Sequence, residues 1–294
     1  MAGTGIQTMG ISSYLLVTQK GRTYVPFCRG SCFMLPYTSV SFYAHHVITA
    51  AHIARPHRFA PLFGNPPSFQ GIGDRHVSWK AYALDREGFN TGAQQPLFLA
   101  NKLDTINSVH SVSLRVAKEE EQIAEQRAKM KELEQEYYFD NTTAVTPDGA
   151  PLDLNEELVC EGVECVEDPT GVNDETMVFR HRRIPIVCRA AVTSKGFGTL
   201  VLASSETPFP PSMCGGPVIR RSSGKCVGVI TAPLRTTPPE PPAELEEITH
   251  TRPVYMDITD NPGVMKEMGG EGSIGVAFTP LAEFLLQLRR LEGI

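Results

Sequence analysis

The sequence predicts an all-β protein, a barrel or a sandwich of antiparallel strands. Much of the 294-residue chain consists of short runs rich in Val, Ile, Thr and aromatic residues, with Gly and Pro between them. Runs of about four to eight such residues, bounded by turn residues, are typical of strands. With 41% hydrophobic and 20% charged residues, the chain has an ordinary globular composition and can bury a sizeable core.

The expected strands follow one another along the chain. They lie at 13–18, 31–35, 39–50, 111–116, 158–166, 184–194, 198–204, 217–221, 226–231 and 273–279. The stretch "PSMCGGPVIRRSSGKCVGVIT", residues 211–231, predicts a tight turn followed by a hairpin. Two glycines and a proline close the turn, a polar loop separates two apolar runs, and Cys214 lies at the apex of the turn.

Helix is expected in two places. Residues 117–140 are almost entirely strong helix formers, without Gly or Pro, and their apolar residues form one narrow stripe among charged faces. Such a stripe indicates a helix that lies across the barrel surface or contacts another protein. The second helix is expected in "PLAEFLLQLRRL" near the C-terminus, whose denser apolar face should pack on the body of the protein.

These elements divide the chain into four segments. Residues 1–12 are expected to form a flexible tail, 13–116 a first β-barrel, 117–150 the helical insertion with a loop, and 151–294 a second β-barrel with the C-terminal helix. Within the last segment, residues 235–262 are Pro-rich and acidic, which is typical of an extended surface loop.

Charge and cysteine content limit the function classes. A formal net charge of -6 gives no reason to expect nucleic-acid binding by the whole surface. The first acidic residue is Asp74, however, so the N-terminal part has a mildly basic face; a loosely charged surface is the favoured interpretation, and weak RNA contact is the lesser alternative. The seven cysteines lack the paired spacings of a zinc site or a disulfide framework, which favours a reducing compartment. We expect no cofactor and no metal.

The sequence also bears on location. No run approaches the roughly 18 apolar residues that a membrane span needs, and no secretory signal pattern is visible. The opening segment is rich in Ser, Thr and Gly and free of acids, like an organelle transit peptide, but it lacks the arginines of such peptides. The expected location is intracellular, in the mitochondrial matrix or the cytoplasm.

Four motifs, taken in order, carry a family resemblance. "GSCFML" at 30–35 precedes "VITAAHIA" at 47–54, "SMCGGP" follows at 212–217, and "IGVAFTPLAEFLLQL" spans 274–288. Their order and spacing resemble the trypsin-like peptidases of the chymotrypsin fold, nearest to the HtrA/Deg-type branch, over nearly the whole chain. The resemblance implies a double six-stranded β-barrel, here with a charged helical insertion and a C-terminal helix.

The resemblance also implies a site for peptide-bond hydrolysis. It places His52 at the general base and Cys214 at the nucleophile, where the family commonly has serine. A thiol beside an imidazole forms thiolate readily, so the pair is chemically competent as a dyad. The simpler alternatives are a buried core histidine and a small buried cysteine that fills the turn.

Four departures from the family pattern argue against activity, and the cysteine nucleophile is the first. The position of the orienting acid is matched by Ser111 or, with a one-residue slip, by His110, and neither is a carboxylate. Asp104 lies six residues before that strand and could reach the site only through an unusual loop. Ser212 replaces the glycine that supplies an oxyanion N–H. Pro233, on the strand that would pair with substrate, has no N–H to donate.

We therefore predict a trypsin-like-fold pseudo-protease, catalytically inactive, that acts as a structural or interaction subunit of a larger protein assembly. Its expected partners are other proteins, bound through helix 117–140 and loop 235–262. The alternative is an active endopeptidase that uses a Cys214/His52 dyad.

Overall fold

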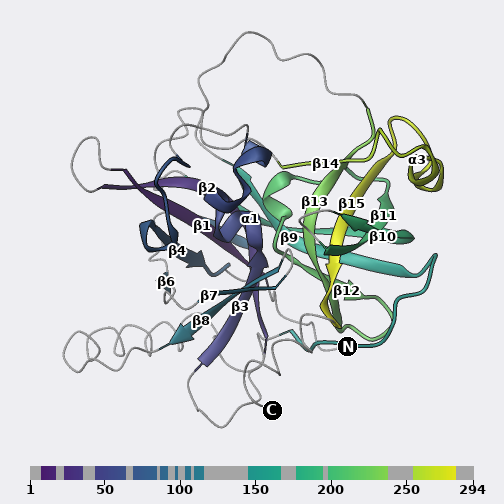
Figure 1. Cartoon of the computed structure of the whole chain (residues 1–294). Helices are drawn as coiled ribbons and strands as arrows, with labels where there is room; N and C mark the ends of the chain where they lie inside the picture. Colours follow the sequence, from purple (N-terminus) through teal and green to yellow (C-terminus); the bar gives the residue numbers. More distant parts are fainter. Residues whose placement is uncertain are drawn as a thin grey trace.

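A computed structural model of the chain shows two antiparallel β-sheets packed against each other, with the short helix α1 between them (Figure 1). It describes residues 8–17, 23–35, 44–63, 69–84, 87–91, 97–98, 103–106, 109–115, 145–166, 177–194, 198–237 and 254–282. The all-β class predicted from the sequence is confirmed, because two antiparallel sheets make up most of the described chain. Helix 117–140 and the C-terminal helix beyond residue 282 lie outside the described residues.

The first sheet has seven strands in the order β6-β4-β1-β2-β3-β8-β7. They are β1 (Thr8–Val17), β2 (Thr23–Leu35), β3 (Ala44–Ala50), β4 (Val77–Tyr82), β6 (Leu97–Phe98), β7 (Leu103–Ile106) and β8 (Val109–Arg115). Seven strands in an open order differ from the six-stranded closed barrel expected for this half. Within the described residues, no pairing joins the end strands β6 and β7.

The start of the first sheet corrects the predicted tail. Residues 8–12 belong to β1 rather than to a flexible segment, and Met9 and Ile11 are buried in the core. Ser12 and Ser13 are buried as well, beside the bulge where the β1–β2 register shifts. Small polar residues in this segment made a buried strand resemble a tail.

The second sheet closes on itself. Its strands are β9 (Glu157–Val166), β10 (Val178–Ser194), β11 (Gly198–Ser205), β12 (Pro217–Arg220), β13 (Cys226–Arg235) and β15 (Ile274–Pro280). Pairing runs β9-β10-β11-β15-β13-β12 and back to β9, so these six strands form a closed ring, as predicted for a six-stranded barrel. Two short strands are added to it: β5 (Phe89–Thr91) pairs with β10, and β14 (Met256–Asp257) pairs in parallel with β13.

Short helices occupy the connections. They are α1 (Ala51–Ala54), the 3-10 turns η1 (Pro56–Phe63), η3 (Asp74–His76) and η4 (Pro211–Met213), and α3 (Pro262–Met268). Helix α3 was not predicted, although its ends carry clear signals. The Asn261 side chain accepts a hydrogen bond from Val264 N at the N-cap, Pro262 opens the helix, and Gly269 adopts a left-handed conformation at its end.

The last part of segment 235–262 is not an extended surface loop. Val254 and Ile258 are buried, and the residues between them include β14. Val254 packs in the same cluster as Trp79 of the first sheet, whereas Ile258 packs beside α3 and β15. Residues 238–253 lie outside the described part.

Core side chains from both sheets pack together. One cluster joins Cys28 and Ile53 of the first half to Cys214 and Ala232 of the second. A second cluster joins Phe33, Leu35 and Ile48 of the first sheet to Ile219, Cys226 and Val229 of the second. Apolar side chains of both sheets therefore share two core clusters, and Cys214 of the candidate site lies in the first of them.

Residues 145–157 connect the two sheets on their way into β9. Val145 N donates to Met34 O of β2 at 2.9 Å, and Asp148 N donates to Cys226 O of β13 at 2.7 Å. Val145 itself is fully buried. This segment is therefore fixed at one end to the first sheet and at the other to the second.

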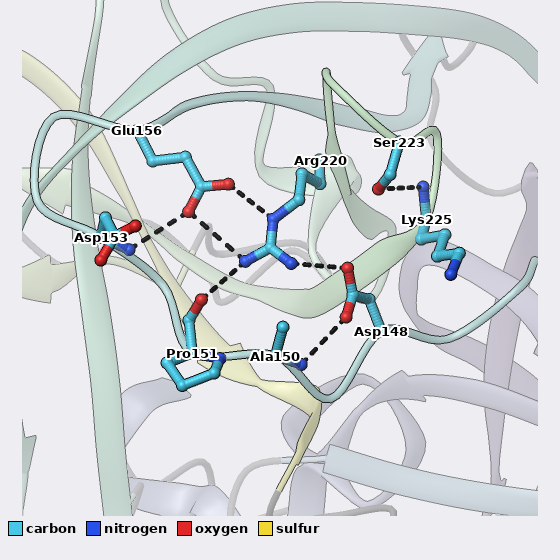
Figure 2. Close-up of polar contacts among 8 residues, drawn as sticks. All are labelled: Asp148, Ala150, Pro151, Asp153, Glu156, Arg220, Ser223 and Lys225. Atoms are coloured by element: carbon cyan, nitrogen blue, oxygen red, sulfur yellow. Dashed lines mark hydrogen bonds and ion pairs between the residues drawn. The ribbon is translucent and has the colours of Figure 1, made fainter.

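The guanidinium of Arg220 on β12 holds the same segment in place (Figure 2). Its Nε donates to Glu156 Oε1 at 2.6 Å, one terminal nitrogen to Asp148 Oδ2 at 2.5 Å, and the other to Pro151 O at 2.7 Å. The hydrogen bond from Ala150 N and the one from Arg220 lower the pKa of the Asp148 carboxyl. Burial opposes the charge on Glu156, but hydrogen bonds from Arg220 and from Asp153 N give it a lowered pKa.

Candidate active site

The glycine-rich turn that carries Cys214 packs directly on β2 and β3. Ser31 N donates to Cys214 O at 2.8 Å, and Gly215 N donates to Ile230 O at 2.8 Å. Gly215 has φ +90°, and a Cβ placed on it would lie 2.1 Å from Ser31 O and 2.3 Å from Thr49 Oγ1. Only glycine fits there, because both the backbone conformation and the close approach exclude a side chain. The turn thus meets β3 three residues before His52.

Cys214 is sealed from solvent. Its side chain is 1% exposed and packs in the cluster that contains Cys28, Ala50 and Ile53. Burial, and to a lesser degree the nearby Cys28 sulfur, raises the pKa of the Cys214 thiol far above its ordinary value. A thiol held protonated is a poor nucleophile, since the thiolate is the reactive form.

His52, in α1, is equally buried at 1% exposure. Burial lowers the pKa of its imidazole to about 4, so the ring is neutral at physiological pH. Its Nδ1, the atom that an orienting acid would contact, has no hydrogen-bond partner among the described residues. Within that part of the chain, no hydrogen bond joins the imidazole to the Cys214 thiol. The Phe59 ring lies roughly perpendicular to the imidazole, with 6.5 Å between the ring centroids.

The buried neutral imidazole predicts loss of stability in acid. Between the ordinary pKa of 6.5 and the folded-state pKa of about 4, the unfolded chain binds a proton at His52 and the folded chain does not. The neutral His52 therefore makes its full contribution to the free energy of unfolding above pH 6.5. Below that pH the contribution decreases, by about 3 kcal/mol at pH 4. Urea unfolding at pH 7, 6, 5 and 4 measures this loss. His52→Leu should show a shallower decline, and an equal decline in both proteins would contradict the assignment.

The main-chain donor of the candidate oxyanion hole is already occupied. Cys214 N donates to Pro211 O at 3.1 Å, and Met213 N donates to Pro210 O at 2.9 Å, which closes the 3-10 turn η4. An oxyanion hole needs N–H groups aimed at the reacting oxygen from about 2.7 to 3.1 Å. In this conformation the Cys214 N–H points back into its own turn.

Ser212 has a role that its sequence position did not reveal. Its Oγ donates to Val163 O at 2.9 Å and accepts from Cys165 N at 2.9 Å, both on β9. The expectation of a merely altered oxyanion position is therefore incomplete, because this side chain binds the turn to the second barrel. Ser31 Oγ completes the contact, since it donates to Ser212 O at 2.8 Å. The hydrogen-bonded residues lie 47 to 181 positions apart in the sequence, so a local motif cannot predict that they pair.

Strand register places the other predicted residues. Ser111 of β8 lies opposite Ile48 of β3 on one side and opposite Asp104 of β7 on the other. Asp104 is thus a strand neighbour of the position expected for the acid, rather than a residue on a remote loop. Pro233 of β13 pairs with Val276 of β15, beyond an irregularity in register.

The acid-free N-terminal region presents fewer exposed cations than its sequence implies. Arg29 and Arg55 are buried, and Arg58 is exposed. Arg55 and Arg58 both form ion pairs with Asp74, the first acid of the chain, at 3.5 and 2.5 Å. This arrangement does not favour the lesser alternative of RNA contact through this region.

Metal and membrane features were searched over the described ranges. There, no three His, Cys, Asp or Glu side chains lie together in a way that could hold a metal ion. All seven cysteines fall within the described residues and are free thiols. No helix in the described part of the chain has the length and apolar content to cross a membrane.

No known protein family and no curated protein matches the chain. Among solved structures, it is similar to the crystal structure of the scabies mite inactivated protease paralogue S-D1, with a TM-score of 0.45 and 9% sequence identity. The alignment covers 99% of this chain and 97% of the mite protein. Similarity at this level carries no information about activity, because one fold supports many functions.

Proposed function

We propose that the chain is a pseudo-protease of trypsin-like fold, without peptidase activity, that serves as a structural or interaction subunit of a protein assembly. The observation that carries the proposal is the burial of the candidate dyad, since His52 and Cys214 are each 1% exposed. A peptide bond must reach within about 3.5 Å of a nucleophile to react. The bond from Cys214 N to Pro211 O adds support, because it removes a donor on which the chemistry depends.

A peptide vinyl sulfone, incubated with the native protein, tests the inactive site. We expect the seven cysteines to be labelled slowly, with Cys214 no faster than the others, and His52→Ala to leave that pattern unchanged. A fluorescent casein substrate should remain intact in parallel. Rapid labelling of Cys214 that disappears in His52→Ala would establish the alternative, an active cysteine endopeptidase, and would contradict the proposal.

The assembly role is tested separately, through the segments proposed as contacts with other proteins. Deletion of residues 117–140 should leave the thermal midpoint nearly unchanged, since their apolar stripe is too narrow to contribute much to a core. The same deletion should release the protein from its native complex, seen as a smaller species on size-exclusion chromatography. A large loss of thermal stability would show that this segment packs on its own barrel instead.

A further inference from the structure

Two serine hydroxyls connect the turn η4 to both sheets. Ser31 Oγ, on β2, donates to Ser212 O at 2.8 Å and accepts from Val163 N of β9 at 2.8 Å. Ser212 Oγ donates to Val163 O and accepts from Cys165 N, each at 2.9 Å. Four hydrogen bonds therefore join β2, η4 and β9 at one point, and Ser31 is fully buried there.

These bonds act on both sides of the Cys214 amide. Ser31 N donates to Cys214 O, whereas Ser31 Oγ holds Ser212 O. To free the Cys214 N–H, the carbonyl of Pro211 that accepts its hydrogen must rotate away, and rotation of the Pro211–Ser212 peptide changes the φ of Ser212. The Cβ of Ser212 limits the φ values that this residue can adopt, and the two hydrogen bonds of its hydroxyl to β9 further resist the change.

We propose that Ser31 and Ser212 form a lock that keeps the η4 turn closed, with the Cys214 N–H bonded to Pro211 O and the Cys214 thiol buried. The inference rests on the proposed function, because it names the residues that hold the site without a free oxyanion donor. Both serines are positioning residues, since they act through the backbone of the turn. A site that had merely decayed would not require hydroxyl groups at these two positions.

Amide hydrogen exchange of the full chain tests the lock directly. In Ser212→Ala and in Ser31→Ala, exchange within residues 211–216 should rise roughly tenfold, as loss of hydrogen bonds to the turn implies. Ser212→Thr keeps a hydroxyl and should restore protection, which a role in packing alone would not predict. Alkylation of Cys214 by iodoacetamide should become faster in the two alanine variants and fastest in Ser212→Gly, which removes the Cβ as well.

Ser205→Ala is the matched control. Its hydroxyl also makes hydrogen bonds, to Pro185 O at 3.2 Å and to Thr207 O at 3.1 Å, but at the end of β11 and without a hydrogen bond to η4. Exchange within residues 211–216 should be unchanged in this variant. Equal effects of Ser205→Ala and Ser212→Ala on the turn would overturn the lock.

Other outcomes separate the lock from the proposed function. Unchanged exchange of the turn in both Ser31→Ala and Ser212→Ala would overturn the lock, while slow labelling of Cys214 in the unaltered protein would still support a pseudo-protease. Exchange that rises equally across β9, β13 and the turn in both variants would show that the two serines stabilise the fold as a whole. That result would also overturn the lock. Fast labelling of Cys214 in the unaltered protein would overturn both.

Discussion

Gly215→Ala is expected to lower the free energy of unfolding by about 3 to 5 kcal/mol, from a left-handed backbone penalty and from overpacking. The new methyl group would lie 2.1 Å from Ser31 O and 2.3 Å from Thr49 Oγ1, and the Thr49 hydroxyl already donates a hydrogen bond to Ser31 O at 2.8 Å. Neither can move without disturbing the contact between β2, β3 and the turn. Chemical denaturation monitored by the single tryptophan, Trp79, measures the loss.

Gly224→Ala is the control for that substitution. Gly224 also has a positive φ, +69°, but a Cβ placed on it meets no atom within 4 Å. Gly224→Ala should lower the free energy of unfolding by only the left-handed backbone penalty, about 1 kcal/mol. Equal losses at the two positions would show that the Gly215 turn has room for a side chain, and the close packing of the site would then be wrong.

Arg220→Ala is expected to lower the free energy of unfolding by about 3 to 4 kcal/mol, because it leaves two largely buried carboxylates without their cationic partner. The side chains of Asp148 and Glu156 are 16% and 19% exposed, and both carboxyls have a lowered pKa beside the guanidinium. Arg220→Lys should recover only part of the loss, since an ammonium cannot reproduce the fork that contacts Asp148, Pro151 and Glu156 at once. Thermal unfolding at pH 7 gives the comparison.

Arg221→Ala provides the neighbouring control. Arg221 and Glu157 form an ion pair at 2.8 Å, but their side chains are 68% and 65% exposed. Such a surface pair contributes little, so the loss should stay within about 0.5 kcal/mol. If both arginine substitutions had the same small effect, the segment that leads into β9 would not depend on Arg220.

The second barrel was predicted well from the sequence, and the first sheet less so. Strands such as β11 and β15 have apolar runs bounded by Gly, Ser or Pro, so their composition alone identifies them. β1 begins in "TMGISS", where buried serines hide the alternation of Met9 and Ile11. β4, "VSWKAY", includes Lys80, whose ammonium lies over the Tyr14 ring at 4.4 Å. The contact joins Lys80 to a strand that is adjacent in the sheet but far away in the sequence, so the local pattern of residues does not predict it.

The candidate site shows the same limit. Motif order predicts that the segments around His52 and Cys214 form facing walls of one cleft, and in the structure Ile53 and Cys214 pack in one buried cluster. It could not predict the direction of the Cys214 N–H, which depends on hydrogen bonds between residues far apart in sequence. Ser31 and Val163 are separated by 132 residues, and Ser31 and Ser212 by 181. Such pairings become visible only when both sheets are assembled.

The pH dependence of Cys214 alkylation tests the closed site most directly. Iodoacetamide reacts with thiolate, so the rate at each pH reports the thiolate fraction of an accessible thiol. Because burial raises the pKa of Cys214, we predict a slow rate that stays low from pH 6 to pH 9 and is unaffected by His52→Ala. A fast rate that levels off near neutral pH, and that falls in His52→Ala, would reveal an ion pair between imidazolium and thiolate and would contradict the account.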